Sequence, residues 1–123
     1  MLLQDFYTIE QLDTISEGKY VAIVNLNKDH DIFKGHFPGN PVTPGVCMMQ
    51  IIKELSEEIL KESLFMTSSS NVKFMALINP DVNSKLKLEL EISGDITTEI
   101  RVKNVTYFDD TVALKLTNTY KKA

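Results

Sequence analysis

Polar and apolar residues alternate with a period of two through much of the second half of the chain. Residues 85–92 (KLKLELEI) place aliphatic side chains on one face and charged side chains on the other. Such alternation predicts a strand with one buried face. The same pattern predicts strands around residues 100–105 and 112–116, joined by a turn at Asp109–Asp110. Residues 72–78 (VKFMALI) predict another strand, which should end at Asn79–Pro80.

The first half of the chain contains one strand pattern and then one long helix pattern. The apolar run 20–26 (YVAIVNL) predicts a strand. Thr43 is expected to cap a helix whose first residue is Pro44, where the missing N–H of proline costs nothing. Because residues 46–49 are all apolar, the start of this helix should be buried on every side. Further along, apolar residues recur at helical spacing up to Ile59, with charged residues on the other face.

This order of elements predicts an α+β fold. A strand, a long loop, one helix and four strands should form an antiparallel sheet with the helix packed on one of its faces. The length of 123 residues suits a single domain that spans residues 1–123.

Composition narrows the class of protein. Hydrophobic residues make up 43% of the chain and charged residues 24%, as in folded soluble proteins. The net charge of −4 and the pI of about 5.1 argue against nucleic-acid binding, which needs a basic face. One cysteine and two histidines offer no Cys/His zinc pattern, so we expect no metal. We find no pattern of a signal peptide or membrane span and expect a cytoplasmic protein.

The segment with the most specific chemistry is the loop 35–46 (GHFPGNPVTPGV). Its prolines and glycines predict a rigid loop, and it contains His36, a side chain suited to proton transfer near neutral pH. The loop ends at a predicted helix N-terminus, whose unpaired N–H groups favour a negatively charged oxygen. This combination suits removal of a proton next to a carbonyl group. The alternative is a Pro/Gly-rich turn with a solvated histidine.

This loop resembles the signature of the 3-hydroxyacyl-acyl carrier protein dehydratases. In that family a His-Phe-Pro-Gly run is followed by Pro-x-x-Pro-Gly-Val and a long helix, as in residues 36–46 and beyond. The resemblance implies the hotdog fold, in which a curled antiparallel sheet wraps one central helix. It also implies a homodimer whose two sheets join into one, with further assembly left open. The implied reaction converts a 3-hydroxyacyl thioester, carried on the phosphopantetheine arm of an acyl carrier protein, to a trans-2-enoyl thioester without metal or redox cofactor.

The resemblance also assigns site residues. His36 matches the catalytic histidine, and Gly45 matches the glycine whose N–H binds the thioester carbonyl. The family's helix carboxylate lies fourteen residues after the histidine, where this chain has Gln50. An amide cannot protonate a leaving hydroxyl. Glu54 stands one helical turn later, where the family usually has a glutamine, so the two residues look exchanged.

Several of these residues have alternative interpretations. Glu54 could supply the missing acid, through Gln50 or a water, or it could belong to a solvated charged helix face. The further expected substrate contacts are Phe37, Pro44, Val46 and Met49. Candidates for an acyl tunnel, or simply for the core, are Phe33, Phe37, Met48, Met49 and Phe74.

Three other features have simpler explanations. His30 is expected to be a surface loop residue, and Cys47 a small buried hydrophobe. Lys73, Lys121 and Lys122 could face an acidic carrier protein, although scattered surface lysines are common.

Two alternatives to a dehydratase stay open. The same fold could serve an acyl thioesterase, which activates water. Gln50 also fits a catalytically degenerate subunit that binds acyl groups or pairs with an active relative.

Overall fold

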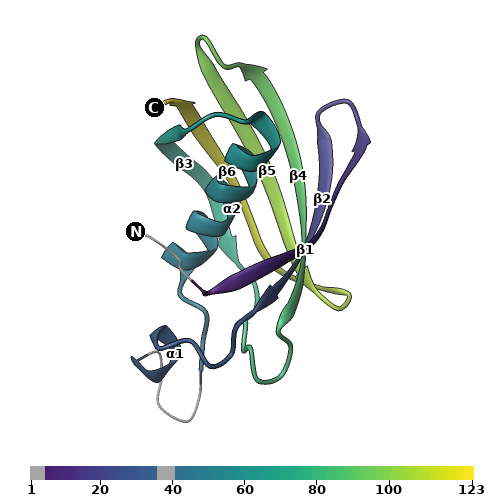
Figure 1. The fold of residues 1–123 in the computed structure, drawn as a ribbon, viewed down its shortest axis with the longest axis vertical. Helices are drawn as coiled ribbons and strands as arrows, with labels where there is room; N and C mark the ends of the chain where they lie inside the picture. Colours follow the sequence, from purple (N-terminus) through teal and green to yellow (C-terminus); the bar gives the residue numbers. More distant parts are fainter. Residues whose placement is uncertain (1–4, 36–40) are drawn as a thin grey trace.

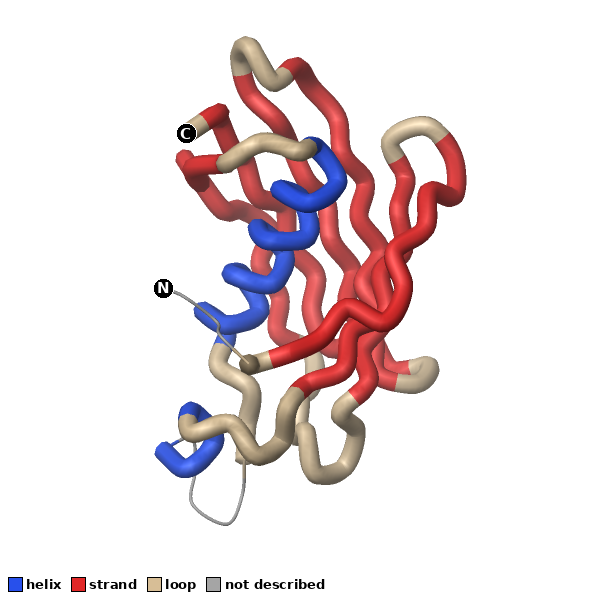
Figure 2. The backbone as a smooth tube through the Cα atoms, in the orientation of Figure 1, coloured by secondary structure: helices blue, strands red, loops and turns tan. Residues whose placement is uncertain are grey.

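The computed structural model describes residues 5–35 and 41–123, and it shows one antiparallel sheet curled around a central helix (Figure 1). The strands lie in the order β1-β2-β4-β5-β6-β3. The tube view shows the long helix α2 lying in the hollow of this sheet (Figure 2). This is the expected α+β hotdog arrangement. The elements are β1 (Tyr7–Ser16), β2 (Lys19–Leu26), α1 (Ile32–Gly35), α2 (Gly45–Leu60), β3 (Leu64–Phe74), β4 (Lys85–Asp95), β5 (Glu99–Phe108) and β6 (Thr111–Lys122).

Helix α2 forms the centre of the core because its apolar residues recur on one face. Met48, Ile51, Ile52 and Leu55 are almost completely buried. They pack with the inward-facing side chains of the sheet, which alternate along each strand, as in Leu86, Leu88 and Leu90 of β4. The helix ends at Lys61, whose backbone takes the left-handed conformation and donates a hydrogen bond to Glu57 O at 2.8 Å.

The start of α2 differs from the prediction in two respects. Pro44 occupies the N-cap position and Gly45 is the first helical residue, so the expected cap by Thr43 is wrong. The Thr43 side chain is buried, and its hydroxyl has no hydrogen-bond partner among the described residues. Val46 is 65% exposed, because it faces away from the sheet, so the first turn is not buried on every side.

The interior strands follow the predicted alternation, and the edge strands do not. Residues 85–92 lie within β4, and Asp109–Asp110 forms the turn between β5 and β6. The sheet also contains β1, which the sequence did not predict. Strand β3 begins at Leu64 and ends at Phe74, so residues 75–78 lie beyond it instead of within the expected strand.

The two outer strands leave their outer edges unpaired within the described residues. β1 pairs only with β2, and β3 pairs only with β6. β3 and the segment after it carry large exposed apolar side chains, namely Phe65, Met66, Val72, Phe74, Met75 and Leu77. An exposed edge of this kind is a template for pairing with another strand.

Candidate functional site

The site is built where the Pro/Gly-rich loop enters α2. His36 and Phe37 lie outside the described residues. The loop end is fixed because Thr43 N–H donates to Ile78 O at 2.8 Å. No side chain caps the helix, and no described residue accepts a hydrogen bond from the Gly45 N–H. The helix therefore presents an unpaired donor at its positive end, which suits a carbonyl oxygen that gains negative charge.

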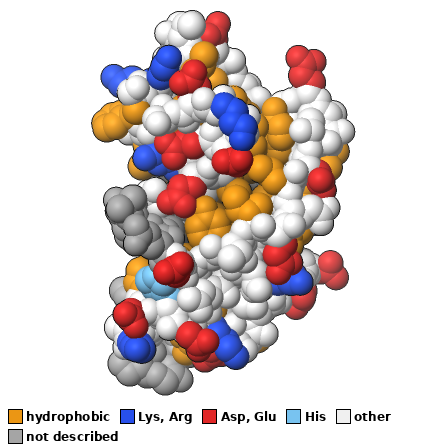
Figure 3. Space-filling view, in the orientation of Figure 1, with side chains coloured by type: hydrophobic (Ala, Val, Ile, Leu, Met, Phe, Trp, Pro, Cys, Tyr) orange, Lys and Arg blue, Asp and Glu red, His pale blue; other side chains and the backbone are white. Residues whose placement is uncertain are grey.

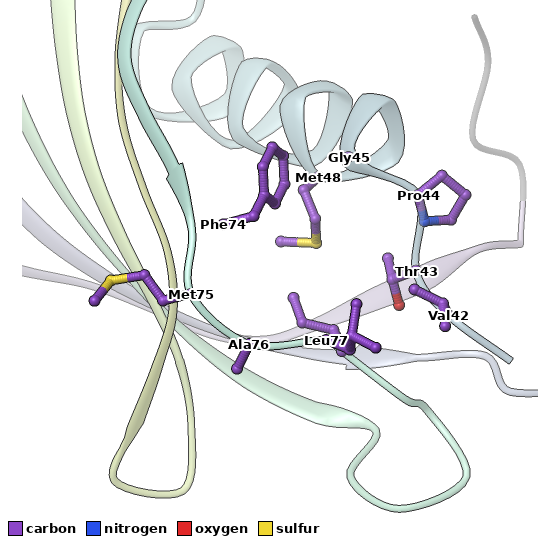
Figure 4. Close-up of a pocket in the computed structure, with 10 residues that line it drawn as sticks. Val42, Thr43, Pro44, Gly45, Met48, Phe74, Met75, Ala76 and Leu77 are labelled. Carbon is purple, nitrogen blue, oxygen red and sulfur yellow. The ribbon is translucent and has the colours of Figure 1, made fainter. Parts of the chain in front are cut away.

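A cavity of about 530 Å³ opens beside this helix end (Figure 4). Its wall combines the loop end, the first turn of α2 and the segment that follows β3. A Cβ atom at Gly45 would lie 2.7 Å from Cζ of Phe74, so a larger residue at this position would displace the Phe74 ring from the cavity wall. The close-up shows the Phe74 ring against the helix start, next to Met48. The lining residues are Val42, Thr43, Pro44, Gly45, Met48, Phe74, Met75, Ala76, Leu77 and Ile78.

The cavity brings together some of the expected substrate contacts and omits others. Pro44 and Gly45 line it, and so do two of the tunnel candidates, Met48 and Phe74. Val46 and Met49 do not line it. Phe33, another tunnel candidate, packs in the core against the ring of Phe6, with centroids 5.3 Å apart.

A second cluster lies further along α2. Gln50 Nε2 donates to Glu54 Oε2 at 2.8 Å, and the Tyr7 hydroxyl donates to Glu54 Oε1 at 2.8 Å. Both oxygens of the Glu54 carboxylate are thus engaged, and the side chain is half-buried. The exposed Glu58 instead pairs with Lys61, one turn along. Glu54 is therefore not one more member of a solvated charged face.

Electrostatics in this cluster favour a protonated tyrosine. Burial raises the pKa of Tyr7 well above its usual range, and the hydrogen bond to Glu54 and the charges of Glu54 and Glu57 act in the same direction. Figure 3 shows acidic side chains gathered over α2, beside hydrophobic surface in the hollow of the sheet.

The cavity and the cluster face different sides of α2. Gly45 and Gln50 are five residues apart, which places them about 140° apart around the helix axis. Within one chain, therefore, Gly45 and the Gln50–Glu54 pair do not line the same cavity.

The other candidates have structural roles. His30 Nδ1 accepts a hydrogen bond from Ile32 N–H at 3.1 Å, and its ring meets Phe6 edge-on. Cys47 is buried, as expected, and burial raises the pKa of its thiol. Lys121 lies over the Phe65 ring.

Two kinds of feature are absent from the residues that the structure describes. Residues 5–35 and 41–123 contain no group of three or more His, Cys, Asp or Glu side chains that could hold a metal ion. Over the same ranges, no helix combines the length and apolar character needed to span a bilayer.

Tyr7 is the member of the cluster around Glu54 that the sequence analysis missed. It is 47 positions from Glu54 and belongs to a strand that the sequence did not predict. Nothing in the spacing of residues could have paired the two, because only the folded sheet brings β1 to α2.

A family model and several curated relatives all relate this chain to dehydratases. The model of a family described as ApeI-like, ApeI dehydratase, matches residues 12–113. The 3-hydroxyacyl-[acyl-carrier-protein] dehydratase FabZ of Lactococcus lactis is 33% identical over 92 residues, which cover 69% of this chain and 60% of that protein. FabZ of Bacillus velezensis is 30% identical over 112 residues, 85% of this chain and 78% of that protein. The chain thus spans about three fifths of the length of the first of these curated relatives.

Solved structures show the same fold at low identity. The dehydratase heterocomplex ApeI:P from Xenorhabdus doucetiae matches with a TM-score of 0.74 and 18% identity, over 94% of this chain and 97% of that one. A hypothetical thioesterase with coenzyme A from Streptococcus pneumoniae matches with a TM-score of 0.69 and 16% identity, over 99% of this chain and 91% of that one.

Proposed function

The chain belongs to the ApeI-like family of dehydratases, and we propose that it removes water from a 3-hydroxyacyl thioester to give a trans-2-enoyl thioester. The observation that carries the proposal is the cavity that opens at the uncapped start of α2, with Gly45 in its wall. The substrate would arrive on the phosphopantetheine arm of an acyl carrier protein, in fatty-acid or related acyl-chain biosynthesis. We place the reaction in the cytoplasm and assign it no metal or redox cofactor.

His36 and Gly45 would carry the first step. His36 takes the proton from the carbon next to the thioester carbonyl, and the electron pair of that C–H bond moves toward the carbonyl oxygen. The Gly45 N–H donates to this oxygen as its negative charge develops. Phe37 and Pro44 would then contact the acyl group, together with Met48 and Phe74 of the cavity wall. The free N–H, the helix dipole and the adjacent cavity support this assignment.

Gln50 and Glu54 would serve the side of the leaving hydroxyl. When the bond between C3 and oxygen breaks, the departing oxygen must gain a proton to leave as water. Both oxygens of Glu54 already accept hydrogen bonds, from Tyr7 and Gln50, so the imidazolium of His36, which has just received a proton, is the better donor. Gln50 would hold the hydroxyl without protonating it.

A homodimer would complete the site. The free edge of β3, with Phe65 57% exposed, supports a dimer in which the two sheets join. A second copy would also supply a second α2, which removes the difficulty that Gly45 and Gln50 of one chain face different sides. Phe65→Glu is expected to halve the mass measured by sedimentation. Ile15→Glu, on the opposite sheet edge at β1, is the matched control, because Ile15 is exposed to a similar degree (62%).

Turnover of a short 3-hydroxyacyl thioester tests the reaction. We expect the wild type to generate enoyl absorbance and His36→Ala to lose it. His30→Ala is the control, because His30 is the other histidine of the chain and lies in a structural turn. Full activity in His36→Ala would contradict the assignment. Release of free thiol without enoyl product would instead indicate a thioesterase.

A second candidate function follows from Gln50. A chain with an amide at the family's carboxylate position could bind acyl groups or pair with an active relative, and the solved ApeI:P structure is named a heterocomplex. This candidate predicts a silent wild type in which Gln50→Glu gains turnover. An active wild type would exclude it.

A further inference from the structure

The hydrogen bonds from Tyr7 through Glu54 to Gln50 have a direction. Tyr7 can only donate to a carboxylate, and its raised pKa keeps it protonated at neutral pH. An ionised carboxylate has only acceptor sites, so the amide atom that faces it must be the NH2 group of Gln50. The chemistry of the three groups thus fixes which end of the amide faces Glu54.

The other end of the same amide is then defined. The side-chain amide is planar, so its carbonyl oxygen lies on the branch that points away from Glu54. No described residue donates a hydrogen bond to this oxygen, and Gln50 is only half-buried. A polar acceptor with a fixed orientation is therefore left for another molecule.

We propose that Tyr7 and Glu54 are positioning residues that hold the Gln50 amide with its carbonyl oxygen toward the ligand, so that Gln50 recognises the 3-hydroxyl group of the acyl chain by accepting its hydrogen bond. The inference rests on the proposed function, including its homodimer, because the leaving hydroxyl would reach Gln50 from the cavity of a second copy. It adds a substrate preference: a ligand with a hydroxyl donor at C3 should bind better than an isostere that cannot donate.

The charge of Glu54 is what makes the orientation unique. A neutral glutamine at position 54 could donate as well as accept, so the Gln50 amide would be stable in either of its two flipped orientations. A phenylalanine at position 7 would leave one carboxylate oxygen without its protein donor and would loosen the carboxylate.

Two non-reacting ligands measure the preference. S-(3-Hydroxybutyl)pantetheine and S-(3-fluorobutyl)pantetheine have nearly the same shape, and neither has the thioester carbonyl that dehydration requires. Only the first can donate a hydrogen bond at C3. Wild type is expected to bind it up to about tenfold more tightly, which is the upper range for one neutral hydrogen bond.

The variants separate positioning from folding. Glu54→Gln is expected to bring the preference to about twofold or less, and Tyr7→Phe to at least halve it. Tyr107→Phe is the matched control, because the Tyr107 hydroxyl donates to Glu89 Oε1 at the same 2.8 Å, on two other strands. It should keep the wild-type preference. Nitrogen-15 NMR of the Gln50 side chain adds a readout without ligand: its two N–H signals should shift in Tyr7→Phe and stay in place in Tyr107→Phe.

Two results would overturn the inference. One is an unchanged hydroxyl preference in Glu54→Gln, and the other is unchanged Gln50 signals together with unchanged preference in Tyr7→Phe. Turnover with 3-hydroxybutyryl-pantetheine tests the proposed function separately. Turnover without any hydroxyl preference would overturn only the role of Gln50. A retained preference without turnover would overturn only the dehydratase assignment.

Discussion

Replacing Thr43 by valine should stabilise this protein. The side chain is 7% exposed, and its hydroxyl is buried with no hydrogen-bond partner among the described residues. A buried polar group left unpaired costs about 1–3 kcal/mol. Valine keeps the shape and branching of threonine, and the backbone hydrogen bond from residue 43 to Ile78 is unaffected. The free energy of unfolding should therefore rise by about 1 kcal/mol or more.

The same substitution at Thr106 should have the opposite effect on the free energy of unfolding. Thr106 is also fully buried, but its hydroxyl donates to Asn104 Oδ1 at 2.8 Å. Thr106→Val leaves that oxygen without its donor and should destabilise by about 1–3 kcal/mol. Urea denaturation at one fixed protein concentration compares both variants with the wild type. A fall in the midpoint of Thr43→Val as large as that of Thr106→Val would refute the argument.

Three further predictions concern pH, the cavity wall and the surface. Burial is the main cause that raises the pKa of Tyr120 to about 12, whereas unfolded tyrosine titrates near 10. The contribution of Tyr120 to stability should be intact below pH 10 and fall by about 1.4 kcal/mol per unit between pH 10 and 12. The fall in stability measured by pH-resolved denaturation should therefore be smaller in Tyr120→Phe than in the wild type. Gly45→Ala should change the unfolding free energy by less than about 1 kcal/mol, because the Phe74 ring that the new methyl group displaces is 58% exposed. Turnover should nevertheless fall about tenfold or more, because the cavity wall moves. A large loss of stability in this variant would contradict the prediction. Lys34→Ala should leave the melting temperature unchanged within about 1 °C, because its ion pair with Asp31 is exposed on both sides.

The interior of the sheet and the long helix were predictable because burial imposes a period. Residues 85–92 have one solvent-exposed face and one buried face, and the structure places them in β4 as expected. Met48, Ile51, Ile52 and Leu55 recur at helical spacing for the same reason. In both the strand and the helix, the spacing of apolar residues along the chain matches the face that is buried in the core.

Strand β1 escaped prediction, and β3 was predicted only in its last residues, because buried alternation is absent from both. In β1 only Tyr7 and Leu12 are even half-buried, and in β3 only Leu64 is buried. These strands exist because their backbones pair with β2 and β6, which is a tertiary effect. The Thr43 cap failed for a related reason, since the loop end pairs with Ile78 and the helix starts one residue later than expected.

The candidate site was half predictable. The i, i+4 spacing placed Gln50 and Glu54 together, and the structure gives them a hydrogen bond of 2.8 Å. The spacing could not reveal that Phe74 and the segment after β3 build a cavity against the Gly45 side of the helix. Neither could it reveal Tyr7, whose contact with α2 depends on the path of β1 across the sheet.

The path of β1 also implies a gradient in how tightly this strand is held. At its start, Phe6 is fully buried between aromatic rings and Tyr7 is bonded to the helix. At its far end Ile15 is exposed, and the pairing is interrupted by a register shift before Ser16. Backbone amides should therefore exchange with deuterium slowly near Tyr7 and quickly near Ser16. The β1–β2 hairpin can open at its tip while the end that holds Glu54 remains closed.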